Sequence, residues 1–404
     1  MGGRTRARTR ENGAKSVAAP AALCPHAPDC VGCPLIGVRY SEQLRHKRQR
    51  VVQAIAAHAP SLDVEVAKAI GSVRVFGYRN QVKLVARKSA ASARGLLLGV
   101  YKPASHAVVD VSQCPVHDAL IARALATVRR AVEGADVPLY DETSREGWLR
   151  YVAVRSSWSR RTTQVILVVR DRGWRGERRL VEVLRRAHGI GSVVLNVNDT
   201  TGNTVFSDQF VARTRYDALV ERVGGIKIKF RAGSFVQANL ASARRAYEKV
   251  VELAALSEDD TAVDLYCGVG AISLMLGLSG ASVFGIEVSP SAVRDAVENT
   301  RLNGLHNVRF RCGTTAEILP GLASELARVD VVTLNPPRKG ATLDVLDSIV
   351  AARPRRIVYM SCDPESLACD LETLVGAGYA TKAVHPFDFL PQTEHVECVA
   401  VLEC

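Results

Sequence analysis

The C-terminal part of the chain has a regular pattern of hydrophobic and polar positions. From about residue 226 to 404, short apolar runs that are typical of buried strands alternate with stretches of helical spacing. The expected strands are residues 262–266, 282–287, 308–312, 329–334 and 356–360. This alternation predicts a doubly wound, mostly parallel α/β sheet. A last apolar run at 396–402 predicts an antiparallel edge hairpin with residues 381–388.

The preceding part, from about residue 70 to 225, has a β-rich pattern instead. Its expected strands are residues 81–86, 96–101, 151–156, 163–169, 192–197 and 203–211, and its expected helices are residues 121–132 and 178–187. This order predicts an α+β module before the parallel sheet. Residues 41–58 have helical spacing and carry many basic side chains.

These patterns predict four segments. Residues 1–20, rich in Arg, Gly, Ala and Ser, are expected to form a disordered basic tail. A cysteine-containing loop and a helix follow at 21–69, then an α+β domain at 70–225 and the α/β domain at 226–404.

The composition of the chain indicates where the protein is located and what kind of partner it binds. The 404 residues are 47% hydrophobic and 23% charged, as in ordinary globular proteins, and no apolar run is long enough to span a membrane. The N-terminus is basic but lacks the apolar core of a secretory signal, so a cytoplasmic location is expected. The net charge of +12 suits a polyanion, and charge alone does not distinguish RNA from DNA.

The ten cysteines of a cytoplasmic protein indicate metal binding or catalysis rather than disulfides. Cys24, Cys30 and Cys33 lie close together in a proline-rich loop, and Cys114, in a turn before a proline, is the best candidate for a fourth ligand. Four cysteines can hold zinc or an iron–sulfur cluster, and the spacing does not decide between them. The simplest alternative is a set of unrelated loop cysteines.

Cys362 directly follows the expected strand at 356–360, so it lies at the edge of the sheet where open α/β proteins have their ligand crevices. A thiol there is a nucleophile or simply a small core residue. Glu397 begins the last expected strand, within reach of Cys362 in such a sheet. A carboxylate at a dry cleft has a raised pKa and can act as a base. The alternative is a solvated glutamate at a strand end.

A glycine-containing loop, Asp264–Gly270, follows the first strand of the α/β domain and opens a helix. Glycines let the backbone approach a ligand closely. Glu287 ends the next strand and suits the hydroxyls of a ribose. Ser273 stands where a dinucleotide fingerprint has its third glycine, and the pattern is more typical of S-adenosyl-L-methionine enzymes than of NAD enzymes. Another nucleotide remains the alternative.

The sequence Asn335-Pro336-Pro337-Arg338 ends the fourth expected strand beside the same crevice. It is similar to the Asn-Pro-Pro-aromatic motif of amino methyltransferases, but Arg338 replaces the aromatic residue that would stack on a flipped adenine. A proline turn that merely ends the strand is the structural alternative.

Six motifs occur in the order found in RNA uracil-5-methyltransferases, and the chain resembles the 23S ribosomal RNA branch over about residues 22–404. The motifs are the loop Cys24–Cys33 with Cys114, Gly233–Asn239, Asp264–Gly270, Asn335–Gly340, Ser361–Pro364 and His395–Glu397. Many members have Phe-Phe-Gln in the second motif, where this chain has Phe235-Val236-Gln237. The resemblance is to the shorter subgroup, so we expect no oligonucleotide-binding TRAM domain before Cys24.

The resemblance implies a class I methyltransferase (Rossmann-like) domain behind an α+β domain that carries a [4Fe–4S] cluster. It implies cluster ligands at Cys24, Cys30, Cys33 and Cys114. It implies S-adenosyl-L-methionine contacts from Gln237, Tyr266, Glu287 and Asn335. It also makes Cys362 the nucleophile and Glu397 the base.

The implied reaction is C5-methylation of a uridine in RNA through a covalent bond between a cysteine and C6 of the uracil. The expected substrate is 23S ribosomal RNA, and the expected enzyme is a monomer without a membrane partner. Three alternatives stay open: the same reaction on the T-loop of transfer RNA, an amino methyltransferase that uses Asn335-Pro336-Pro337, and a non-catalytic RNA-binding protein with a structural metal.

Overall fold

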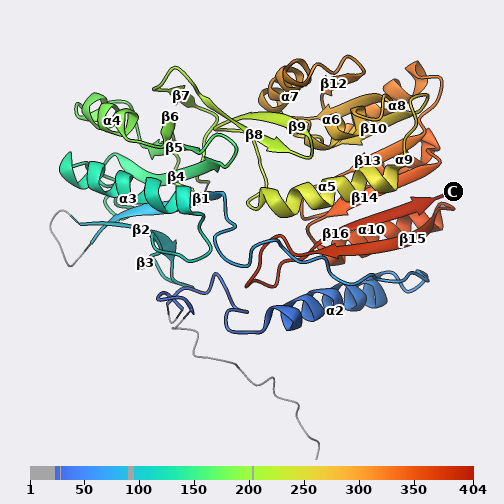
Figure 1. Ribbon diagram of the computed structural model, residues 1–404, viewed down its shortest axis with the longest axis horizontal. Helices are drawn as coiled ribbons and strands as arrows, with labels where there is room; N and C mark the ends of the chain where they lie inside the picture. Colours follow the sequence, from blue (N-terminus) through green and yellow to red (C-terminus); the bar gives the residue numbers. More distant parts are fainter. Residues whose placement is uncertain (1–22, 28, 90–94, 203) are drawn as a thin grey trace, which may run out of the picture.

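The computed structural model describes residues 23–27, 29–89, 95–202 and 204–404. The expected basic tail at residues 1–20 lies outside the described residues. Within them, two seven-stranded sheets and one two-stranded sheet carry the fold. In Figure 1 the strands of the first large sheet run from light blue to green, and those of the second from gold to red. In the described part of the chain, no helix combines the length and apolar character needed to cross a membrane.

The first sheet has the strand order β3-β2-β1-β4-β5-β6-β7 and is mostly antiparallel. Its strands are β1 (Gln81–Lys88), β2 (Leu96–Tyr101), β3 (Val108–Asp110), β4 (Leu149–Ser157), β5 (Thr162–Val169), β6 (Ile190–Val197) and β7 (Phe210–Ala212). Helices α3 (Ala119–Gly134) and α4 (Glu177–Arg186) pack on it through a shared apolar core. The α+β character of this region agrees with its sequence pattern.

The strand expected at residues 203–211 is wrong, because β7 covers only Phe210–Ala212. Side chains in and just after β6, rather than a neighbouring strand, satisfy backbone groups before β7. The Asn196 side chain donates to the Ser207 carbonyl and accepts from the Ser207 amide, and the Asn198 side chain donates to the Thr204 carbonyl. Polar side chains that bond to nearby backbone compete with a strand ladder in this way.

A hairpin that the apolar pattern did not reveal joins the two large sheets. Strands β8 (Ala218–Val223) and β9 (Ile226–Arg231) pair antiparallel around Gly224 and Gly225. Both glycines have positive φ angles, 53° and 85°, which a two-residue hairpin turn requires and which glycine adopts without strain. The predicted domain boundary between residues 225 and 226 falls inside this turn.

The second sheet has the order β12-β11-β10-β13-β14-β16-β15. Its strands are β10 (Thr261–Leu265), β11 (Ser282–Glu287), β12 (Val308–Cys312), β13 (Val331–Leu334), β14 (Arg356–Ser361), β15 (Ala380–Phe387) and β16 (Glu397–Glu403). The first five are parallel, and β15 and β16 form an antiparallel hairpin at the β14 edge. The doubly wound sheet and the edge hairpin are therefore confirmed.

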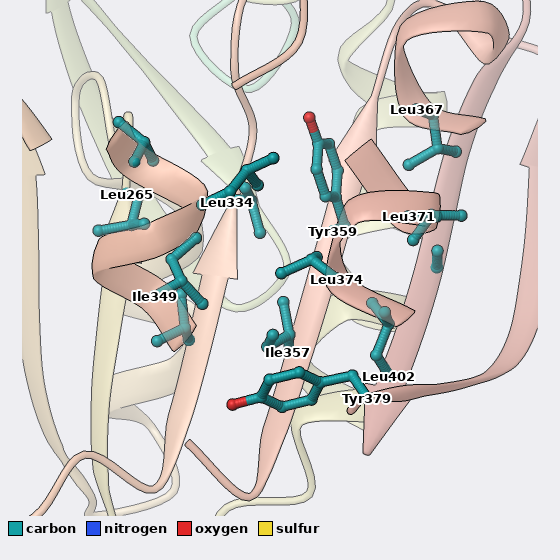
Figure 2. Packing of buried hydrophobic residues seen from close by; sticks show 14 of the residues in the cluster. Leu265, Leu334, Ile349, Ile357, Tyr359, Leu367, Leu371, Leu374, Tyr379 and Leu402 are labelled. Carbon is teal, nitrogen blue, oxygen red and sulfur yellow. The ribbon is translucent and has the colours of Figure 1, made fainter. Parts of the chain in front are cut away.

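Helices cover both faces of this sheet (Figure 1). One face carries α5 (Leu240–Ala254), α6 (Ala271–Gly277) and α7 (Pro290–Asn303). The other carries α8 (Thr315–Glu325), α9 (Leu343–Ala352), α10 (Pro364–Gly376) and α2 (Tyr40–His58). Figure 2 shows the apolar core on the face that α8, α9, α10 and α2 cover. There, Ile349 of α9 and Leu371 and Leu374 of α10 pack over Leu334 and Ile357 of the sheet.

The chain direction across the sheet reverses between β10 and β13. The strands β10, β11 and β12 follow one another toward one edge, whereas β13 and β14 lie on the other side of β10. In open α/β sheets a ligand crevice forms at the carboxyl ends of the strands beside such a reversal. Tyr266 follows β10, Asn335 follows β13 and Cys362 follows β14, so these predicted site residues share one edge.

Candidate active site

The loop after β10 has a backbone that is specific for glycine. Tyr266, Gly268 and Gly270 all have left-handed φ angles, of 59°, 56° and 84°. A Cβ atom added to Gly270 would lie 2.8 Å from a ring carbon of Phe310, so both the conformation and the space require glycine there. The turn places the start of α6 directly over the sheet edge.

This loop forms one side of a cavity at the switch point. Three of the predicted cofactor residues, Gln237, Tyr266 and Asn335, line it together with the glycine loop. Glu287 lies outside that lining, at the end of β11. Its carboxylate accepts hydrogen bonds from the amides of Gly268, at 3.0 Å, and Ser289, at 2.8 Å. Glu287 thus holds the loop beside the cavity.

The acid that opens the loop supports the fold beneath the cavity. Asp264 is buried, and its carboxylate accepts hydrogen bonds from the hydroxyls of Thr333, at 2.7 Å, and Ser273. Burial raises the pKa of Asp264 to about 6, although both hydroxyls lower it. Ser273, which replaces the third glycine of a dinucleotide fingerprint, therefore ties α6 to β10.

The strand register brings Cys362 and Glu397 together. In the antiparallel pair of β14 and β16, Ser361 is opposite Cys398, so the next positions outward are Cys362 and Glu397. The Cys362 thiol is half-buried. Burial raises its pKa, the charge of Glu397 raises it further, and the Arg338 cation lowers it.

The pKa of Glu397 is also shifted from its ordinary value. Burial raises the pKa of Glu397 to about 7, and Arg338 is the cation that opposes this rise. Among the described residues, no group donates a hydrogen bond to its buried Oε2 atom. A buried acceptor without a partner is costly, so it marks a position prepared for something other than stability.

Arg338 is a site residue that the sequence pattern did not identify. It lines the same pocket as Cys362, and its Nη2 atom lies 3.5 Å from Nδ1 of His395. The sequence indicated only that an arginine replaces an aromatic residue. A cation after the two prolines, next to a candidate thiolate, was the available signal.

Tyr247 of α5 is a second such residue. It is buried and lines the same cavity as Gln237 and Tyr266. Burial raises its pKa, and the charges of Glu397 and Asp264 raise it further, so the hydroxyl stays protonated. A tyrosine at helical spacing among apolar residues is normally core, and the sequence held no signal of this position.

The four predicted cluster ligands meet in another pocket. Its lining includes Cys24, Cys30, Cys33 and Cys114, although Cys114 is 81 positions beyond Cys33. Burial raises the pKa of Cys33 to about 12, and the nearby Cys114 is the next cause. In the described residues, no group of three or more His, Cys, Asp or Glu side chains is arranged so that it could hold a metal ion. The shared pocket is therefore the observation that links these four cysteines.

Comparison with known proteins gives three findings. The family model described as tRNA (Uracil-5-)-methyltransferase matches residues 208–404. An uncharacterized RNA methyltransferase of Geobacter sulfurreducens is 40% identical over 380 residues, which are 94% of this chain and 76% of that protein. An uncharacterized RNA methyltransferase of Halalkalibacterium halodurans is 33% identical and covers 95% of this chain and 83% of its own length.

A solved structure has the same fold over nearly the whole chain. The Pyrococcus abyssi tRNA (uracil-54, C5)-methyltransferase in complex with S-adenosyl-L-homocysteine superimposes with a TM-score of 0.75 and 25% sequence identity. The match covers 93% of this chain and 86% of the other. It includes both large sheets, so the likeness is not limited to the α/β domain.

Proposed function

The chain belongs to the tRNA (uracil-5-)-methyltransferase family, and from this premise we propose that it methylates C5 of a uridine in RNA with S-adenosyl-L-methionine as the methyl donor. The observation that carries the proposal is the placement of Cys362 opposite Glu397 at the sheet edge that also forms the cavity of Gln237, Tyr266 and Asn335. A nucleophile, a base and a donor site are the minimum set for this reaction.

Cys362 starts the reaction, because C5 of uracil is a weak nucleophile. Its thiolate bonds to C6 of the ring, which places negative charge on the ring and makes C5 nucleophilic. Bound S-adenosyl-L-methionine supplies an electrophilic methyl group, and Gln237, Tyr266, Asn335 and the Glu287 loop would hold it.

Glu397 completes the reaction. Its carboxylate takes the proton from C5, the electron pair of that C–H bond re-forms the C5–C6 double bond, and the Cys362 sulfur leaves as a thiolate. A base with a pKa near the working pH transfers protons most effectively. The raised pKa of Glu397, about 7, and its unpaired Oε2 atom suit this role.

The test is to trap the covalent intermediate with RNA that contains 5-fluorouridine, which has no C5 proton for the base to remove. We expect an adduct whose peptide map identifies Cys362, and no adduct with Cys362→Ala. The exposed Cys369 provides the matched control, and Cys369→Ala should form the adduct like the parent. Methylation that persists in Cys362→Ala without any adduct would favour an amino methyltransferase instead. Failure of calorimetry to detect S-adenosyl-L-methionine binding would favour a non-catalytic RNA-binding protein.

The proposed substrate is 23S ribosomal RNA, on the strength of the motif resemblance. Transfer RNA is the second candidate, and the names of the matching family and of the similar archaeal structure favour it. Mapping 5-methyluridine in both RNAs from a strain without the gene decides between them. Loss of the modified base from 23S ribosomal RNA supports the first, and loss from transfer RNA overturns it.

We also propose that Cys24, Cys30, Cys33 and Cys114 hold a [4Fe–4S] cluster, because their thiols line one pocket. The cluster would cross-link the N-terminal loop to the loop after β3. Anaerobically purified protein should be brown and contain iron and sulfide in equal amounts. Active, colourless protein that contains zinc would contradict the cluster.

A further inference from the structure

One wall of the pocket around Cys362 comes from the far end of the chain. Val31, Gly32 and Pro34, which lie between and just after two of the candidate cluster ligands, line the pocket together with Cys362 and Asp363. Val31 is 68% exposed, although it is a large apolar residue. A single exposed apolar side chain is ordinary on a protein surface, and what distinguishes Val31 is its place in the lining of the pocket that contains Cys362.

The same short segment also closes the cysteine pocket. Val31 and Pro34 line both that pocket and the pocket of Cys362, so they form a partition between the two. Backbone hydrogen bonds fix the partition from both ends. The Cys30 amide donates to the His26 carbonyl at 2.8 Å, and the Leu35 amide donates to the Gln392 carbonyl at 3.0 Å.

Residues 393–396 form another part of the lining, and helix α2 holds the segment that leads into it. Lys47 donates to the Asp388 carboxylate and to the Leu390 carbonyl, and Arg50 donates to the Glu394 carbonyl at 2.6 Å. The cysteine loop and α2 together therefore position two walls of the pocket that contains the nucleophile.

We propose that Val31–Pro34 is the RNA-contacting wall of the target-nucleotide pocket, with Val31 packed against the nucleotide whose uracil reaches Cys362. This inference rests on the function proposed above. A base that leaves its stack loses contacts that apolar side chains replace. Arg50 and Arg338 line the same pocket and supply cations for the phosphates of that nucleotide. A pocket that combines an apolar rim with two arginines fits a single nucleotide of RNA better than an apolar peptide.

The partition has a second consequence. Because Val31 and Pro34 belong to both linings, the contents of the cysteine pocket set the position of the RNA-contacting wall. The cluster would then support RNA binding through the partition without taking part in the methyl transfer.

The test compares Val31→Glu with Leu302→Glu, each in a Cys362→Ala background so that only reversible binding is measured. Leu302 is exposed near the C-terminal end of α7, at the opposite edge of the sheet. Repulsion of phosphate by the new carboxylate at position 31 should weaken RNA binding by about tenfold or more, equivalent to about 1.4 kcal/mol. Leu302→Glu should bind RNA like its parent. Iron content and the affinity for S-adenosyl-L-homocysteine should be unchanged in both.

A photo-crosslinking amino acid at position 31 gives an independent measurement. We expect it to crosslink to the target nucleotide or its neighbour in an RNA with a defined methylation site, whereas the same amino acid at position 302 should not. If 5-fluorouridine RNA traps Cys362 but position 31 neither crosslinks nor changes RNA affinity, the wall is wrong and the proposed function stands. If no covalent adduct forms between Cys362 and 5-fluorouridine RNA, the proposed function is wrong, and the inference about the RNA-contacting wall is wrong with it.

Discussion

At the scale of single residues, the candidate site places two acidic groups together, and the charge of Glu397 disfavours ionisation of Cys362. Burial raises the pKa values of both Cys362 and Glu397, and the charge of Glu397 raises that of Cys362 further. Arg338, which lines the pocket of Cys362, is the cation that lowers both pKa values. Burial and the Arg338 cation therefore act on these two pKa values in opposite directions, and substitution of a single residue changes the protonation of the site.

The first prediction concerns the base. The rate of methylation should increase as the pH is raised past about 7, because Glu397 accepts a proton only in its ionised form. Glu397→Gln should slow turnover by roughly 10² to 10⁴. The RNA–protein adduct should persist in this variant, since elimination needs the base. Gel analysis of the adduct and single-turnover kinetics measure both effects, and a variant with normal turnover would exclude Glu397 as the base.

The same substitution should increase stability. A carboxyl whose pKa is raised in the folded state opposes folding when it ionises, and this cost grows as the pH rises to about 7. The melting temperature of Glu397→Gln should therefore exceed that of the parent at pH 8, and the difference should be smaller at pH 5. An equal difference at both pH values would show that the carboxylate is not the cause.

The second prediction concerns Arg338. Because its cation lowers the pKa of Glu397, Arg338→Gln should move the rising limb of the pH–rate profile to higher pH. Arg338→Lys keeps the positive charge, so the rising limb of its pH–rate profile should lie close to that of the parent. If the glutamine variant lost activity at every pH without a shift of the limb, Arg338 would act through RNA contact alone.

The residues that the sequence could predict are those whose positions follow from the order of strands. Cys362 and Glu397 had to meet once β14 and β16 were neighbours, since one ends its strand and the other begins the antiparallel strand beside it. Tyr247 and Arg338 belong to the site only through packing between segments. Tyr247 stands among apolar residues at helical spacing, as a core tyrosine does, and the sequence marked Arg338 only as the replacement of an aromatic residue after two prolines.

At the scale of elements, the apolar period predicted the parallel sheet well, because its strands are buried on both faces and alternate with amphipathic helices. The hairpin β8–β9 escaped prediction although its Gly224-Gly225 turn was visible. In β9 apolar and basic residues alternate, which is the pattern of a half-buried strand, so this signal was present in the sequence. In β8 the buried Glu221 is adjacent to Arg222, which breaks the alternation.

The third prediction concerns the attachment of α2. Lys47 and Asp388 are both fully buried, and burial lowers the pKa of Lys47 and raises that of Asp388. Lys47→Met leaves a buried carboxylate unpaired and should cost about 3–5 kcal/mol of unfolding free energy. Adding Asp388→Asn should recover part of that loss, since an amide can still accept from Tyr40.

Denaturant unfolding of the two single variants and the double variant measures this coupling. Lys249→Met is the matched control, because its ion pair with Glu252 is on the surface, and such pairs contribute about 0–1 kcal/mol. Additive losses in the double variant would mean that Lys47 and Asp388 stabilise the chain independently.

At the scale of the whole molecule, the N-terminal segment connects the two large sheets. Its cysteine loop contacts the first sheet's domain through Val111 and Cys114, and α2 packs along α10 on the second. In Figure 1, α2 lies below the β15–β16 edge. A short segment that contacts both domains near the nucleophile can set their relative position where RNA would bind.

The last prediction separates the two ligands of the proposed enzyme. The lining of the S-adenosyl-L-methionine cavity, in the described part of the chain, includes no residue from 24–36, whereas the Cys362 pocket includes three. Cys33→Ser should therefore abolish the brown colour and weaken RNA binding by about tenfold, or about 1.4 kcal/mol. The affinity for S-adenosyl-L-homocysteine in calorimetry should not change.

Cys404→Ser, at an exposed cysteine, provides the control and should keep both affinities and the colour. RNA binding should fall with rising salt in every variant, because phosphate contacts release counterions. The salt slope of Cys33→Ser should equal that of the parent, since the partition is apolar and its displacement removes no cation. A steeper or shallower slope would mean that the cysteine loop itself neutralises phosphate, and unchanged RNA affinity in the colourless variant would separate the cysteine pocket from the RNA site.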